Sequence, residues 1–190
     1  MKATIRLGIY DWLLFSRGET FYPPDLPAEW RLSFFSNEFD AACIDLTDFA
    51  LGLETLLEWV EGLPDQFQLS FLVNDAGALE LLQGLTTQSD VSIHSILSHA
   101  KCEQLSNGLK KMSVRCIEMD SLWSPDRVDC STGMALMPAQ PNLKASRLWI
   151  ELWMQSVQNT DTELTLWLPG ADFSYSSLSE VKTLIELMGY

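Results

Sequence analysis

Basic residues are scarce in this chain. Its 190 residues include 12 Lys and Arg against 26 Asp and Glu, and the formal net charge is −14. No Lys or Arg occurs between Arg31 and Lys101, an interval that holds eleven acidic residues. Such a surface repels a phosphate backbone, so the sequence argues against nucleic-acid binding. The interval predicts either a solvated face that promotes solubility or a docking face for a basic protein partner.

Long apolar runs are also missing. No run approaches the roughly 20 residues that a membrane-spanning helix needs. Residues 1–9 are too short and too interrupted for the apolar core of a signal peptide. We therefore expect a soluble, cytoplasmic protein that does not associate with a membrane.

Metal-binding and cofactor-binding motifs are absent. The four cysteines form no C-x-x-C pair, and in a cytoplasmic chain they are expected to be reduced thiols in or near the core: Cys43, Cys102, Cys116 and Cys130. His94 and His99 are the only histidines, and five positions apart they suit one helix face poorly. We predict no metal site. Neither G-x-G-x-x-G nor G-x-x-x-x-G-K-[ST] occurs, so no cofactor is predicted.

Apolar strand patterns alternate with helical patterns along the chain. Strands are expected at residues 4–9, 41–46, 67–73, 113–119, 133–137 and 164–168, and residues 91–96 suit either a strand or the start of a helix. Helices are expected at 27–37, from 53 to an end near Gly62 and Pro64, and at 78–83, 102–111, 145–158 and 178–188. Continuous apolar strands separated by helices favour a parallel sheet with both faces covered. No linker divides the chain, so residues 1–190 are interpreted as one domain.

Three motifs near the N-terminus carry a family resemblance. Gly8 and Trp12 give G-x-x-x-W, residues 21–27 give F-Y-P-x-x-L-P, and residues 31–39 give an arginine-leucine motif followed by aromatics. In this order and spacing they resemble the YecE-like family (domain of unknown function 72). The resemblance implies an α/β fold, a TIM-barrel-like parallel β/α barrel. The family's Y-x-R-x-H-G strand, expected between Pro138 and the helix at 145–158, is missing here, which implies a shortened barrel of about seven strands.

The departures from the family pattern bear on activity. The family's second strand reads V-E-I-N, where this chain has Cys43 and Asp45 at the Glu and Asn positions. Leu72 replaces the lysine that ends the family's third strand, and of the family's E-F-R-H only Glu118 is kept. Because side chains at the carboxyl ends of barrel strands converge on one pocket, the resemblance implies two sets of candidates. The catalytic candidates are Asp11, Asp45 and Glu118, and the pocket-lining candidates are Trp12, Phe21, Tyr22 and Cys43.

Two functions remain open from the sequence. The loss of the family's cationic groups favours a non-catalytic barrel that binds a protein partner through its acidic surface. A barrel that lacks a strand exposes two sheet edges, so we also expect a homodimer. The alternative is a hydrolase or lyase for a small neutral or cationic substrate, in which Asp45 and Glu118 act as paired carboxylates or hold a divalent cation.

Overall fold

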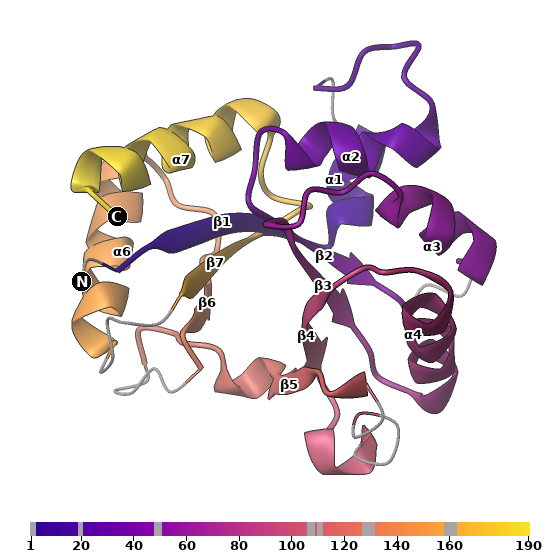
Figure 1. The fold of residues 1–190 in the computed structure, drawn as a ribbon. Coiled ribbons are helices and arrows are strands. Elements are labelled where there is room, and N and C mark those ends of the chain that lie inside the picture. The colour runs from indigo at the N-terminus through magenta and orange to yellow at the C-terminus, as the bar shows by residue number, and fades with distance from the viewer. Residues whose placement is uncertain are drawn as a thin grey trace. The chain divides into compact units, whose positions relative to one another are not determined.

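The computed structural model describes residues 3–18, 21–47, 51–105, 109, 112–126, 132–157 and 163–190. Within these residues, seven strands alternate with six helices and three short 3-10 turns (Figure 1). The chain divides into two compact units. Unit 1 comprises Met1–Phe21 and Ser121–Tyr190, and unit 2 comprises Tyr22–Asp120.

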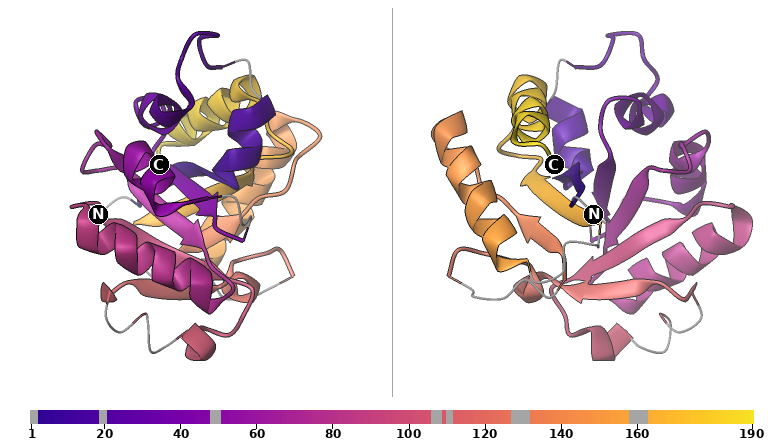
Figure 2. Two further views of the ribbon diagram at one scale, coloured as in Figure 1. Left: turned by 90° about the vertical axis from the view of Figure 1, so that its right-hand side faces the viewer. Right: turned by 60° about the vertical axis from the view of Figure 1, so that its left-hand side comes forward.

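Unit 2 is built on four parallel strands. In sequence they are β2 (Ala41–Asp45), β3 (Gln68–Leu72), β4 (Ile93–Ser98) and β5 (Arg115–Glu118). Their order in the sheet is β5-β4-β3-β2, so each strand pairs in parallel with the next along the chain. Parallel neighbours require crossover connections, which here contain α3 (Leu53–Val60) and α4 (Ala76–Gln88). These two helices lie side by side (Figures 1 and 2).

The remaining elements of unit 2 are short. The 3-10 turn η1 (Ala28–Trp30) leads into α2 (Arg31–Ser36), where the sequence predicted one helix over 27–37. Pro27 is the N-cap of η1, and the N–H of Trp30 donates to its carbonyl oxygen. A 3-10 turn, η2 (Cys102–Leu105), follows β4, where a helix over 102–111 was expected. Most of residues 106–111 lie outside the described part of the chain.

The sheet of unit 2 has two chemically different faces, because side chains alternate along each strand. Leu69 lines a hollow together with residues of α3 and α4, so its face is the one those helices cover. The strand register adds four more residues to this helix face: Ile44, Phe71, Ile96 and Cys116. The opposite face carries Cys43, Ser70, Leu72, Ser95 and Leu97. On it, the buried hydroxyls of Ser70 and Ser95 form a hydrogen bond of 2.9 Å.

Unit 1 is built on three parallel strands in the order β1-β7-β6. These are β1 (Ile5–Tyr10), β6 (Met134–Leu136) and β7 (Leu164–Pro169). Its helices are α1 (Trp12–Gly18), α6 (Leu143–Ser156) and α7 (Tyr175–Met188), and α6 and α7 contact each other. The turn η3 (Met119–Ser121) lies at the boundary between the two units.

The structure confirms the expected fold class. The chain is α/β with seven parallel strands, consistent with a shortened TIM-barrel-like fold. Residues 137–142 run from β6 into α6 without a strand, in the interval where the resemblance implied that a strand is missing. The interpretation of residues 1–190 as one domain stays a prediction. No helix in the described residues is long and apolar enough to cross a membrane.

Further expectations were wrong. No helix was expected between residues 9 and 27, yet α1 follows β1 there. Helix α4 is 13 residues long, although a helix was expected only at 78–83. The carboxylate of Asp75 accepts the N–H of Ala78 and starts the helix at Ala76, and the helix continues to Gln88. Cys102 and Cys116 form a disulfide instead of two reduced thiols. Cys43 is a buried free thiol as expected, and Cys130 lies outside the described residues.

Candidate functional site

Asp11 lies between the last residue of β1 and the first residue of α1. Its φ of 57° lies in the left-handed region, which aspartate tolerates better than most residues. Its Oδ1 accepts the N–H of Leu14 at 3.2 Å, the geometry of a helix N-cap. Gly170, after β7, donates its N–H to the carbonyl of Tyr10 at 2.7 Å. Asp11 therefore fixes the turn that ends β1.

Asp45 is the last residue of β2 and is half-buried. Its Oδ1 accepts two hydrogen bonds from Thr47, one from the backbone N–H at 2.8 Å and one from the side-chain hydroxyl at 2.6 Å. A carboxylate that bonds a backbone N–H two residues later forms an Asx-turn. The carboxylate thereby shapes the loop that leaves the strand.

Glu118 is the last residue of β5 and is also half-buried. Its Oε1 accepts the backbone N–H of Cys102 at 3.1 Å. Cys102 is joined by the disulfide to Cys116, two residues before Glu118. The hydrogen bond and the disulfide together tie η2 to β5, so Glu118 contributes to the connection between β4 and β5.

The sheet of unit 2 keeps Asp45 and Glu118 apart. Asp45 pairs in register with Leu72, so its side chain lies on the face opposite the helices. Glu118 is two residues after Cys116 in β5, so its side chain lies on the helix face. Two strands also separate them, which at the usual spacing places their backbones roughly 14 Å apart along the sheet. Paired carboxylates that act on one bond lie about 5–9.5 Å apart on the same cleft. The geometry does not bring these two together as an acid/base pair.

The four residues expected to line a pocket take part in packing. Trp12 is 1% exposed and Cys43 is 0% exposed. Phe21 stacks on Tyr175 within unit 1, with ring centroids 4.4 Å apart. Tyr22, in unit 2, carries the Arg31 guanidinium over its ring at 5.3 Å.

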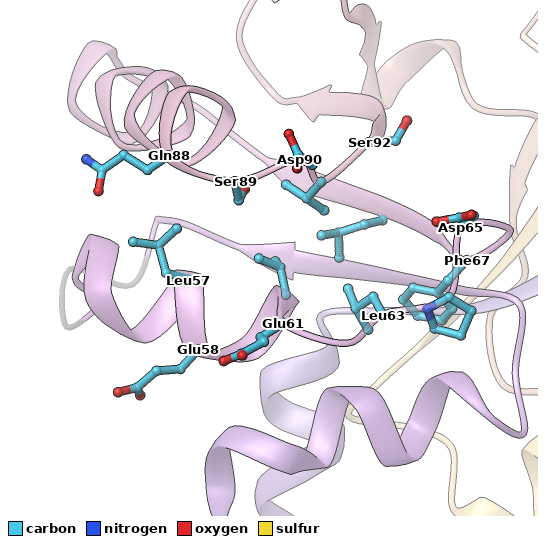
Figure 3. A pocket seen from close by; sticks show the side chains of 14 residues that line it. Leu57, Glu58, Glu61, Leu63, Asp65, Phe67, Gln88, Ser89, Asp90 and Ser92 are labelled. Atoms are coloured by element: carbon cyan, nitrogen blue, oxygen red, sulfur yellow. The ribbon is translucent and has the colours of Figure 1, made fainter.

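A hollow of about 660 Å³ opens between α3 and α4 in unit 2 (Figure 3). It lies at the amino ends of β3 and β4, whereas Asp45 and Glu118 end their strands at the carboxyl side. Its lining includes six apolar residues: Leu57, Val60, Leu63, Phe67, Leu69 and Val91. None of the sequence-predicted site residues belongs to its lining.

Acidic residues border the hollow. Glu58, Glu61 and Asp65 stand on the α3 side and Asp90 on the α4 side, and all four are exposed. Figure 3 shows their carboxylates around the rims rather than inside, with that of Glu58 directed away from the hollow. Helices α3 and α4 both end beside it, and a helix C-terminus carries a partial negative charge. The hollow therefore combines an apolar interior with a negative rim.

Sequence reasoning missed this hollow, although two signals pointed toward it. The interval without Lys or Arg contains all four rim acids. The helical spacing in α3 also showed which residues turn inward. The sequence-based prediction made α4 too short. The helix ends at Gln88, which brings Ser89 and Asp90 to the second rim.

No metal site emerges from the described residues, since they contain no group of three or more His, Cys, Asp or Glu side chains placed to hold an ion. Comparison with known proteins assigns no family to the chain. No family model matches it. No curated protein matches it either. The resemblance to YecE-like proteins therefore stays a prediction, and any function must be argued from the residues themselves.

Proposed function

We propose that this protein is a non-catalytic binding protein that engages a basic protein partner through the acidic face formed by α3, α4 and the turns after them. Six exposed acids define this face: Glu54, Glu58, Glu61, Asp65, Glu80 and Asp90. The observation that carries the proposal is the sign of the charge. From residue 32 to residue 100 the chain has no Lys or Arg to neutralise these carboxylates.

Electrostatics suit such a face to docking. A concentration of one sign of charge steers an oppositely charged partner and raises its association rate, and salt screens the effect. The same field repels nucleic acid. Individual surface ion pairs contribute only about 0.2–1 kcal/mol each, so affinity must come from several of them together with apolar contact.

The roles of the candidate carboxylates also support a binding function. Asp11, Asp45 and Glu118 each accept a backbone N–H that shapes a turn or helix start. The hydrolase or lyase alternative needs Asp45 and Glu118 on one substrate, and they leave different faces of the sheet. A cytoplasmic location and a homodimer remain part of the proposal, and light scattering at several protein concentrations tests the dimer.

The test is capture of a partner with matched charge variants. The purified protein, its E58Q/E61Q variant and an E180Q/E186Q control are each incubated with extract of the source cells and crosslinked. Glu180 and Glu186 are exposed residues of α7, so both variants lose the same charge. We expect one stoichiometric, basic protein that is retained by the wild type and the control, weakened by E58Q/E61Q and released at high salt.

A third variant separates binding from catalysis. D45N/E118Q keeps hydrogen-bond acceptors at both positions, so partner retention should equal that of the wild type. Capture that does not depend on Glu58 and Glu61, or turnover of a small molecule that D45N/E118Q abolishes, would overturn the proposal.

A further inference from the structure

We propose that the hollow between α3 and α4 receives a segment of a protein partner in which a large apolar side chain stands between lysine or arginine residues. This inference rests on the proposed docking function of the acidic face. It goes further by naming the place on that face where recognition occurs and the chemistry that is recognised.

The apolar interior accounts for the central side chain. A volume of about 660 Å³ lies within the range of sites that bury a ligand. It exceeds the volume of one phenylalanine or leucine side chain, which leaves room for neighbouring alkyl stems. Leu57 and Leu63 face Ser89 and Asp90 across the opening (Figure 3). Transfer of a large apolar side chain from water into such an interior strengthens binding about ten- to one-hundred-fold.

The rims account for the flanking cations. Lysine and arginine place their alkyl stems along apolar surface and keep their charged heads in water. Stems lying along Leu57 and Val91 would bring those heads to the rims, where Glu61 and Asp90 stand on opposite sides. In the described part of the chain, neither of these carboxylates has a hydrogen bond or ion pair. Both are thus available to a partner.

The end positions of α3 and α4 add to the preference for a cation. The carbonyl groups at a helix C-terminus favour positive charge and disfavour negative charge. Glu61 is the residue that caps α3, and Ser89 caps α4. An acidic or phosphorylated segment would be repelled, because the rims carry negative charge of the same sign.

The experiment uses the full-length protein and three synthetic peptides, all acetylated and amidated at their ends. The probe is Lys-Lys-Phe-Lys-Lys. One comparison peptide has serine in place of phenylalanine, and the other has glutamate in place of every lysine. Calorimetric titration at low salt should give one-to-one binding of the probe. We expect the serine peptide to bind about ten-fold more weakly or worse, and the glutamate peptide to show no binding.

Variants locate the binding site. L57W and V91W enlarge lining residues from opposite sides of the hollow, and each should reduce binding of the probe to that of the serine peptide. Circular dichroism verifies that each variant is folded. E61Q/D90N should weaken the probe about three- to ten-fold. E180Q/E186Q removes the same charge from exposed positions of α7, outside the acidic face and the hollow, and it should leave affinity within about two-fold.

The outcomes separate this inference from the proposed function. If phenylalanine and serine peptides bind equally, if folded L57W and V91W both bind like the wild type, or if E180Q/E186Q weakens binding as much as E61Q/D90N, the hollow is not the recognition site. Partner capture that still depends on Glu58 and Glu61 would then leave the docking function intact. Loss of that dependence together with these results would remove both.

Discussion

The disulfide between Cys102 and Cys116 should contribute measurably to the stability of unit 2. The two cysteines are 14 positions apart, so the closed loop contains 15 residues. In the chain-entropy treatment, closing a loop of this length destabilises the unfolded state by about 3 kcal/mol at 25 °C. The bond spans the connection from η2 to β5, the last strand of unit 2. Both sulfurs belong to half-buried residues, so replacing them costs little core packing.

The assay compares urea unfolding of the oxidised wild type, the reduced wild type and the C102S/C116S variant. We expect the reduced protein and the variant to unfold at the same urea concentration. The oxidised protein should be more stable by about 3 kcal/mol, which for a chain of this size corresponds to about 6–12 °C in Tm. Reductant should have no effect on C102S/C116S, because the buried Cys43 has no part in the bond.

Two results would refute this reasoning. One is that a thiol reagent labels both Cys102 and Cys116 in the folded protein purified without reductant, as measured by mass spectrometry. The other is equal stability of the oxidised wild type and C102S/C116S. The second result would mean that contacts of η2 and β5 already hold the loop, or that the unfolded chain keeps its ends close without the bond.

Three further substitutions test local features by urea unfolding. G170A should destabilise by more than about 2 kcal/mol, because a Cβ would collide with the carbonyl oxygen of Asp11; equal stability would contradict the close approach. S95A should cost about 1–2 kcal/mol by leaving the buried Ser70 hydroxyl without its partner, and the S70A/S95A double variant should cost less than the sum of the single ones. D75A should cost about 1 kcal/mol through loss of the α4 cap, with D75N restoring most of it.

Strands and crossover helices could be predicted from the sequence because their signals are local. Residues 67–73 carry apolar side chains at five of seven positions, which is typical of a strand buried on both faces, and β3 lies within this segment. The periodic apolar residues from Leu53 to Val60 predicted the start of α3, and the helix ends at Val60, shortly before the expected end near Gly62. Helix α1 was missed because its start depends on Asp11 acting as a cap from a left-handed conformation. No pattern of apolar spacing shows such a cap.

The disulfide could not be predicted because it depends on tertiary structure. Cys102 and Cys116 have no close spacing that marks a pair, and the turn η2 must fold back onto β5 before the sulfurs meet. The expectation of a cytoplasmic chain also favoured reduced thiols. The pairing is therefore evident only from the folded structure, in which η2 lies against β5.

The separation of Asp45 from Glu118 shows why a candidate site is harder to predict than a fold. Side chains of a strand alternate with a period of two, so a shift of one residue in register moves a side chain to the other face. Between β3 and β4 the register contains such an irregularity, at Leu69 and Ser70. Residue Ile117, one position before Glu118, pairs with Leu97 and so shares the face of Asp45. A carboxylate at residue 117 would therefore lie on the same face as Asp45. A single sequence does not show which of two registers, one residue apart, a pair of strands adopts. The proposed binding function rests instead on the sign of the surface charge, which does not depend on strand register.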